Sequence, residues 1–176
     1  MKTGAMTRTD PDLRADERTM LTQYLDYHRA TMESRAEGLG ASALAQTLAP
    51  SALTIAGLVK HLALVEDNWF QEVLLGRPMP EPWHSAPFDD DPDWEFHTAV
   101  DDDLDDLLEL YRAACARSRA AVEEVGDLDA LSVKESRRGE GRFSLRWILL
   151  HMIEETARHN GHADFIRQSI DGLTGE

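Results

Sequence analysis

Four long segments of this chain repeat their apolar residues at the spacing of a helix, and this pattern constrains the fold more than any other feature. The segments cover roughly residues 11–36, 54–75, 102–124 and 144–171. In each, apolar side chains recur three or four positions apart, as they do on one face of an α-helix. No stretch alternates with period two for long enough to predict a sheet. We therefore expect an all-α protein, a four-helix bundle in which the four apolar faces cover one another.

Residues at the ends of these segments indicate where the helices begin and end. Thr54 and Ser144 precede the second and fourth helices, and their hydroxyl oxygens can accept bonds from first-turn N–H groups. Gly126 follows the third helix and Gly172 the fourth, and glycine is the usual residue where a helix ends in a left-handed conformation.

Length and cysteine usage bound the domain organisation and the compartment. A chain of 176 residues can bury a core of its own, and we expect a disordered leader over residues 1–12 and a single bundle domain over residues 13–176. The only cysteine, Cys115, excludes an internal disulfide and a cysteine-rich zinc site, so a reducing cytoplasm is the expected location. No apolar run approaches the roughly 20 residues of a membrane span, and neither a span nor a signal peptide is expected.

The net charge of −15 argues against nucleic acid as a partner. Ten carboxylates fall between Asp89 and Asp106 without a lysine or arginine, and such a stretch repels a phosphate backbone. Only residues 134–146 are locally basic. Arg142 and Arg146 in that segment can receive a small anion, although a solvated loop is the more common meaning of such a cluster.

The connection between the second and third helices, residues 77–101, is long, acidic and rich in proline. Connections of this length without structure are uncommon, and they are usually functional or disordered. Because this one contains Trp83 and Trp94, we expect it to pack against the bundle. The two rings either complete the core or cover a binding pocket.

A row of polar residues on the fourth helix has the side chains that bind metals. At about 100° per residue, its members fall within roughly 80° of one helix face; they are His151, Glu155, His159 and His162. His151 and His159 lie about 12 Å apart along the axis, too far to bind one ion. His159 can share an ion with Glu155 or with His162, because each is one turn away. Spacing alone does not separate these two pairs.

A further ligand has to come from another helix, and the second helix carries a lone histidine, His61. Three protein ligands leave coordination positions open, which distinguishes catalytic metal sites from closed structural ones. Taken alone, His61 fits a hydrogen-bonded core residue better, and Glu155 can simply pair with Arg158 on the surface. Bundle cores seldom bury a carboxylate without a partner, however. Taken together, these residues favour a metal site.

Two motifs in combination resemble the DinB-like superfamily. The first is LTIAGLVKHL over residues 53–62, followed by Glu66 and Trp69, and the second is LLHMIEETARHNGH over residues 149–162. The resemblance covers nearly the whole chain after about residue 15. More narrowly, the chain resembles the actinobacterial branch of "mini-circle protein"-type members.

The resemblance implies a DinB-like four-helix bundle whose divalent metal is held by one residue of the second helix and two of the fourth. His61 matches the first position, and His159, which precedes Asn-Gly, matches the last. Glu155 stands where many relatives have histidine, as it does in the superfamily's mycothiol-dependent maleylpyruvate isomerases, whose triad is His, Glu, His. His162 and His151 are then supporting or substitute ligands. Zinc or nickel is the expected metal for such an N/N/O set.

The first functional hypothesis is a metal-dependent enzyme that uses a low-molecular-weight thiol, with mycothiol as the expected one. It transfers the thiol to a small electrophile or uses it to isomerise one, because a divalent cation lowers a thiol pKa from near 8.5. Arg142 and Arg146 are expected to bind a carboxylate of the thiol or the electrophile, and Trp83 and Trp94 to line the pocket. The two arginines reach the site only if their loop folds back.

The alternative hypothesis is a non-catalytic helical bundle that acts as a protein-interaction module. It dimerises, and its metal site is structural or vestigial. Under this hypothesis no coordination position is exchangeable, and a thiol does not change the spectrum of the bound metal. Members of the superfamily commonly form dimers, so a homodimer is expected under either hypothesis.

Overall fold

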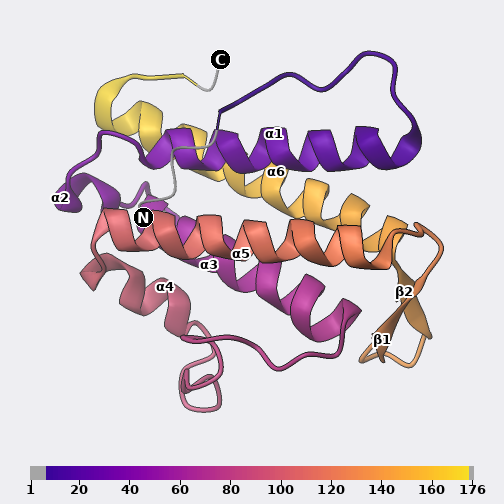
Figure 1. Cartoon of the computed structure of the whole chain (residues 1–176). Helices are drawn as coiled ribbons and strands as arrows, with labels where there is room; N and C mark the ends of the chain where they lie inside the picture. Colours follow the sequence, from indigo (N-terminus) through magenta and orange to yellow (C-terminus); the bar gives the residue numbers. More distant parts are fainter. Residues whose placement is uncertain (1–6, 175–176) are drawn as a thin grey trace.

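Four long helices make up most of the fold, as the apolar periodicity predicts (Figure 1). In the computed structural model, which describes residues 7–174, they are α1 (Glu17–Ala36), α3 (Ile55–Asp67), α5 (Leu104–Val125) and α6 (Leu145–Asp171). Helix α1 packs mainly against α6, and α3 packs mainly against α5. Helix α3 also contacts α6, and the candidate metal residues lie on these two helices. The all-α bundle expected from the sequence is confirmed.

Shorter elements connect the long helices. Helix α2 (Ala41–Leu44) follows α1, and a π-helix, η1 (Asn68–Leu74), continues α3 without a break. Helix α4 (Trp94–Thr98) and the 3-10 helix η2 (Ala99–Asp101) precede α5, and both contact α3. Strands β1 (Leu131–Glu135) and β2 (Arg142–Ser144) form a hairpin between α5 and α6. Among the helices described for residues 7–174, none is both long and apolar enough to cross a membrane.

The capping residues identified in the sequence set the helix ends. The hydroxyl oxygen of Thr54 accepts a bond from the N–H of Gly57 at 3.0 Å, and that of Ser144 accepts one from Trp147 at 3.2 Å. Gly172 ends α6 with a φ of 79°, in the left-handed region. Helix α1, in contrast, begins at Glu17 rather than near residue 11, because the residue before it caps its first turn.

The leader expected over residues 1–12 lies partly outside the described residues, which begin at residue 7. Residues 7–12 form neither helix nor strand. They are nevertheless attached to α1, since the N–H of Asp12 donates to Gln23 at 2.8 Å and the Gln23 amide donates back to the Asp12 carboxylate at 2.9 Å.

The apolar core fills the space between the long helices, and buried ion pairs fix the helices beside it. Arg29 of α1 donates two hydrogen bonds, of 2.7 and 2.6 Å, to Glu66 of α3, and both side chains are buried. The next residue, Asp67, accepts bonds from Arg117 of α5 at 2.7 and 2.8 Å. Asp67 also accepts a bond of 2.9 Å from the indole N–H of Trp83. The long connection is thus held to the bundle through Trp83, as its composition predicts.

The hairpin differs from the sequence expectation, which treats this region as a loop. Its strands are antiparallel, with Leu131 paired to Ser144. In β1 the usual pattern is reversed, because Leu131 and Val133 are exposed while Ser132 is buried. The Ser132 hydroxyl accepts a bond from Phe143 N–H at 3.0 Å and donates to a backbone carbonyl. The apolar and polar residues do alternate here, but only over residues 131–134, which is too short a stretch to predict a sheet.

Candidate metal centre

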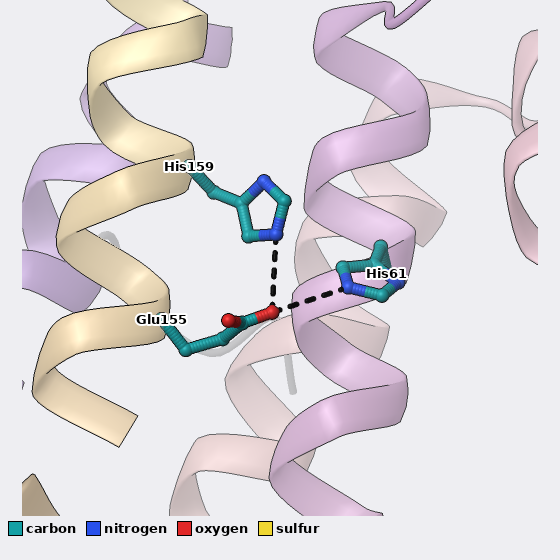
Figure 2. Close-up of side chains that lie close together, drawn as sticks. All are labelled: His61, Glu155 and His159. Carbon is teal, nitrogen blue, oxygen red and sulfur yellow. Dashed lines mark hydrogen bonds and ion pairs between the residues drawn. The ribbon is translucent and has the colours of Figure 1, made fainter. Parts of the chain in front are cut away.

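Three metal-binding side chains from two helices converge on one point (Figure 2). His61 extends from α3, and Glu155 and His159 extend from consecutive turns of α6. Each offers one ligand atom, and these three atoms lie within 4.8 Å of one another. Oε1 of Glu155 is 3.1 Å from Nε2 of His159 and 3.5 Å from Nε2 of His61. All three side chains are partly buried.

Two of the three separations between the ligand atoms are compatible with a shared divalent cation. Ligand bonds of about 2.0–2.1 Å in tetrahedral directions place ligand atoms about 3.3 Å apart. The two nitrogen–oxygen distances at the site, 3.1 and 3.5 Å, lie on either side of that value. Two imidazoles and one carboxylate are a donor set that suits zinc and other late divalent metals. Three such ligands would leave further coordination positions open.

Glu95 contacts the imidazole of His61 at Nδ1, the ring nitrogen that does not face Glu155. Its carboxylate lies 2.8 Å from Nδ1 of His61, and its side chain is only 4% exposed. Phe96, the next residue of α4, stacks on the imidazole with ring centroids 4.6 Å apart. When Nδ1 carries the proton, Nε2 keeps its lone pair for a metal, and carboxylate–histidine contacts of this kind fix both tautomer and ring orientation.

Glu95 was not among the predicted site residues, because in the sequence it is only one of ten carboxylates in an acidic stretch. No spacing rule links it to His61, because the contact depends on how α4 folds back against α3. Its second oxygen is buried, and none of the described residues bonds it. The carboxylate is therefore bonded through one oxygen only, and that bond goes to a candidate metal ligand.

The electrostatics of the site depend on the carboxylate between the two imidazoles. The hydrogen bond from His159, followed by that from His61, holds the pKa of Glu155 far below its usual range. Burial alone would lower the pKa of His61, but its bonds to Glu155 and Glu95 outweigh burial and raise that pKa above 6.5. Glu155 is therefore ionised at neutral pH, as a metal ligand has to be.

The remaining histidines of the α6 row lie outside this cluster. Nδ1 of His162 is 3.4 Å from Nδ1 of His159, on the side of that ring turned away from Glu155. Burial and then the charge of His159 lower the pKa of His162. His151 lies one turn before Glu155 and packs against Trp69 and Trp147, with centroids 4.7 and 5.1 Å away. A supporting role for either histidine remains a prediction.

The arginines expected to bind substrate are engaged in ion pairs near the hairpin. Arg146 donates to Glu17 at 2.7 Å and to Asp129, and these two bonds raise its pKa, that of Glu17 contributing most. Arg142 lies 3.8 Å from Glu135 across the hairpin. None of these pairs involves a residue of the metal cluster.

The two tryptophans of the connection lie beside each other. Trp83 is buried, and its ring meets Trp94 edge-on at 6.5 Å. Lys60 of α3 lies over the Trp94 ring, 4.6 Å from its centroid. The expected role of these rings in lining a substrate pocket remains a prediction.

Comparison with known proteins identifies the family. No curated protein matches the chain. The family model of mycothiol-S-transferase matches residues 20–172, a range that contains the three converging side chains and all four long helices from the first turn of α1 onward. The resemblance to the DinB-like superfamily and the expected enzyme class are thereby confirmed. The chain belongs to the mycothiol-S-transferase family, whose enzymes transfer this thiol to electrophiles.

Proposed function

We propose that this protein transfers mycothiol to a small electrophile at a divalent metal held by His61, Glu155 and His159. The observation that carries this proposal is the convergence of these three side chains from α3 and α6 at metal-like spacing. Family membership supplies the thiol and the type of reaction. Zinc or nickel is the proposed metal, because both accept two imidazoles and one carboxylate.

A bound divalent metal favours the thiolate form of a thiol and so increases the fraction of reactive nucleophile at neutral pH. The protein's own residues supply the rest of the site. Glu155 offers one negative charge to the cation, and the two imidazoles are neutral donors. Glu95 holds Nε2 of His61 in the direction of the other ligands.

The nucleophilic sulfur has to come from a bound thiol, because the only cysteine of the chain is unsuited to this role. Cys115 is 0% exposed and lies in the apolar core. Burial, followed by the charge of Glu66, raises the pKa of its thiol well above the usual value. A neutral, inaccessible thiol is a poor nucleophile. A single reduced cysteine also fits a cytoplasmic location, where we place the reaction. The expected homodimer can be tested by measuring the mass of the purified protein in solution.

Metal content and thiol binding test the proposal directly. The tag-free protein is compared with His159→Ala and with the control His84→Ala, which removes an exposed histidine of the connection. We expect one metal per chain in the wild type and in the control, and its loss in His159→Ala. Adding mycothiol to the cobalt-substituted protein should then produce a thiolate-to-cobalt charge-transfer band. The proposal would be contradicted if the wild-type protein bound no metal, or if adding mycothiol left the spectrum of the cobalt-substituted protein unchanged.

A further inference from the structure

A cavity of about 740 Å³ lies beside the metal centre, between η1, the hairpin and the first turns of α6. None of the three converging side chains lines it. It is nevertheless on the same helix face, because His151 lines it and lies one turn, about 6 Å of helical rise, before Glu155. Asn68, which lines it from η1, lies about 10 Å further along its helix than His61. A volume of this size accommodates a small molecule.

One wall of the cavity is aromatic. Trp69 of η1 meets Phe143 edge-on at 5.1 Å and His151 at 4.7 Å. Trp147 of α6 contacts the same three rings, at 5.3, 4.5 and 5.1 Å, and its side chain is 43% exposed. An exposed tryptophan within such a cluster offers a face on which another planar ring can stack.

The hairpin supplies Phe143 to this cluster and most of the polar lining, and it is fixed to η1. Lys134 forms an ion pair with Glu72 of η1, and Val133 packs against Gly76 so closely that a Cβ there would lie 2.6 Å from the valine methyl carbon. Gly76 has a φ of +66°, so its backbone also favours glycine. These contacts fix the hairpin in place as one side of the cavity.

The charges of the lining leave a positive excess at the turn of the hairpin. Lys134 is paired with Glu72, and Glu135 with Arg142, which does not line the cavity. The lining cations that are left are Arg137 and Arg138, and the only lining carboxylate that is left is that of Glu140. Within residues 7–174, no carboxylate lies at ion-pair distance from either arginine. In a chain with a net charge of −15, these cations are local exceptions that suit an anionic ligand.

We propose that this cavity binds the electrophile, and that the electrophile is a planar aromatic compound carrying an anionic group. The ring stacks on Trp147 and Trp69, and the anion faces Arg137 and Arg138. The reactive carbon is then directed along α6 toward the metal centre. This inference rests on the proposed function, since it names the substrate class of the same reaction.

For an aryl halide as electrophile, the reaction balances without an oxidant or reductant. The sulfur of the thiol donates an electron pair to the ring carbon that carries the halogen, and a C–S bond forms. The C–halogen bond breaks and halide leaves with its electron pair. The proton of the thiol goes to solvent.

A binding experiment tests the cavity independently of catalysis. Dinitrobenzoate, which has no halide to displace, is titrated into the metal-loaded protein without thiol while tryptophan fluorescence is followed. We expect quenching in the wild type and about tenfold weaker binding in the double variant Arg137→Gln/Arg138→Gln. The control is Arg77→Gln, where affinity should stay within about twofold because that exposed side chain pairs with Glu124 and does not line the cavity. Equal affinity in the double variant and the wild type overturns the proposal.

A kinetic experiment with mycothiol separates this proposal from the proposed function. The substrates are a chlorodinitrobenzoate, with chlorine para to the carboxylate, and the matching chlorodinitrobenzene without it. In the double variant, the KM for the benzoate should rise about tenfold, while the KM for the neutral compound stays within about twofold. Unchanged KM values in an active double variant overturn the cavity proposal and leave the function standing. If dinitrobenzoate binding is lost in the double variant but neither the wild type nor the variant transfers mycothiol, the cavity proposal is supported and the proposed transferase function is overturned.

Discussion

Replacing Glu95 tests whether a residue outside the metal cluster controls the metal affinity of His61. The bond between the Glu95 carboxylate and Nδ1 of His61 is 2.8 Å long, and it is shielded from water because Glu95 is 4% exposed. Removing such a partner of a metal-bound histidine weakens metal binding about 10- to 100-fold. At about 1.4 kcal/mol for each factor of ten, this corresponds to about 1.4–2.8 kcal/mol.

The size of the effect depends on what replaces the carboxylate. Glu95→Gln keeps the shape and an oxygen that can accept from Nδ1, but it removes the negative charge, so we expect a loss of about tenfold. Glu95→Ala also frees the imidazole to rotate, and we expect a loss nearer to about 100-fold. In the glutamine variant an amide NH2 group takes the place of the second oxygen, which is buried without a partner in the described residues, so this variant should also be less stable than the wild type without metal.

Chelator competition on the zinc-loaded, tag-free protein measures these affinities. Asp91→Asn is the matched control, because Asp91 lies in the same connection and contacts an exposed histidine, His97, at 2.9 Å. Its metal affinity should equal that of the wild type. A folded Glu95→Ala that bound zinc as tightly as Asp91→Asn would refute this role of Glu95.

Three further changes test the fold and the source of the sulfur. Gly76→Ala should lower the free energy of unfolding by about 1–3 kcal/mol in urea denaturation, because a side chain there is strained and meets Val133; wild-type stability would contradict the described hairpin packing. Arg29→Met should cost about 3–5 kcal/mol by leaving the buried Glu66 unpaired, and a double variant with Glu66→Leu should recover most of this loss. Cys115→Ala should retain thiol transfer with unchanged KM for mycothiol, and loss of activity in a folded variant would point to the protein's own sulfur.

The sequence predicts the helical framework well because its signals are local. Apolar periodicity identifies all four long helices, and the hydroxyls of Thr54 and Ser144 mark two of their beginnings. The hairpin was not predicted, because its strands are short and the alternation of apolar and polar residues in β1 covers only residues 131–134. Periodicity alone also gives no sign that α3 continues as the π-helix η1.

The candidate site could be predicted only in part. Spacing along α6 leaves Glu155 and His162 equivalent as partners of His159, and the resemblance to relatives favours Glu155. In the structure the bundle turns Glu155 toward His61 and leaves His162 on the other side of the His159 ring. Glu95 could not be predicted, because its contact with His61 depends on the path of a connection that has no periodic pattern.

The choice of glutamate rather than histidine at position 155 has a chemical consequence for the thiol. A divalent cation with three neutral imidazoles keeps its full charge of two, whereas one carboxylate ligand reduces the charge of the set to about one. The Glu95 carboxylate, bonded to His61, reduces the local charge further. A less positive centre lowers the thiol pKa by a smaller amount, and a sulfur of higher pKa is intrinsically more nucleophilic once ionised. A divalent metal held by these residues would still favour the thiolate at neutral pH. With a metal bound, the two carboxylates would therefore favour a more nucleophilic sulfur over a more strongly ionised one, and this suits the proposed transfer of the sulfur to an electrophile.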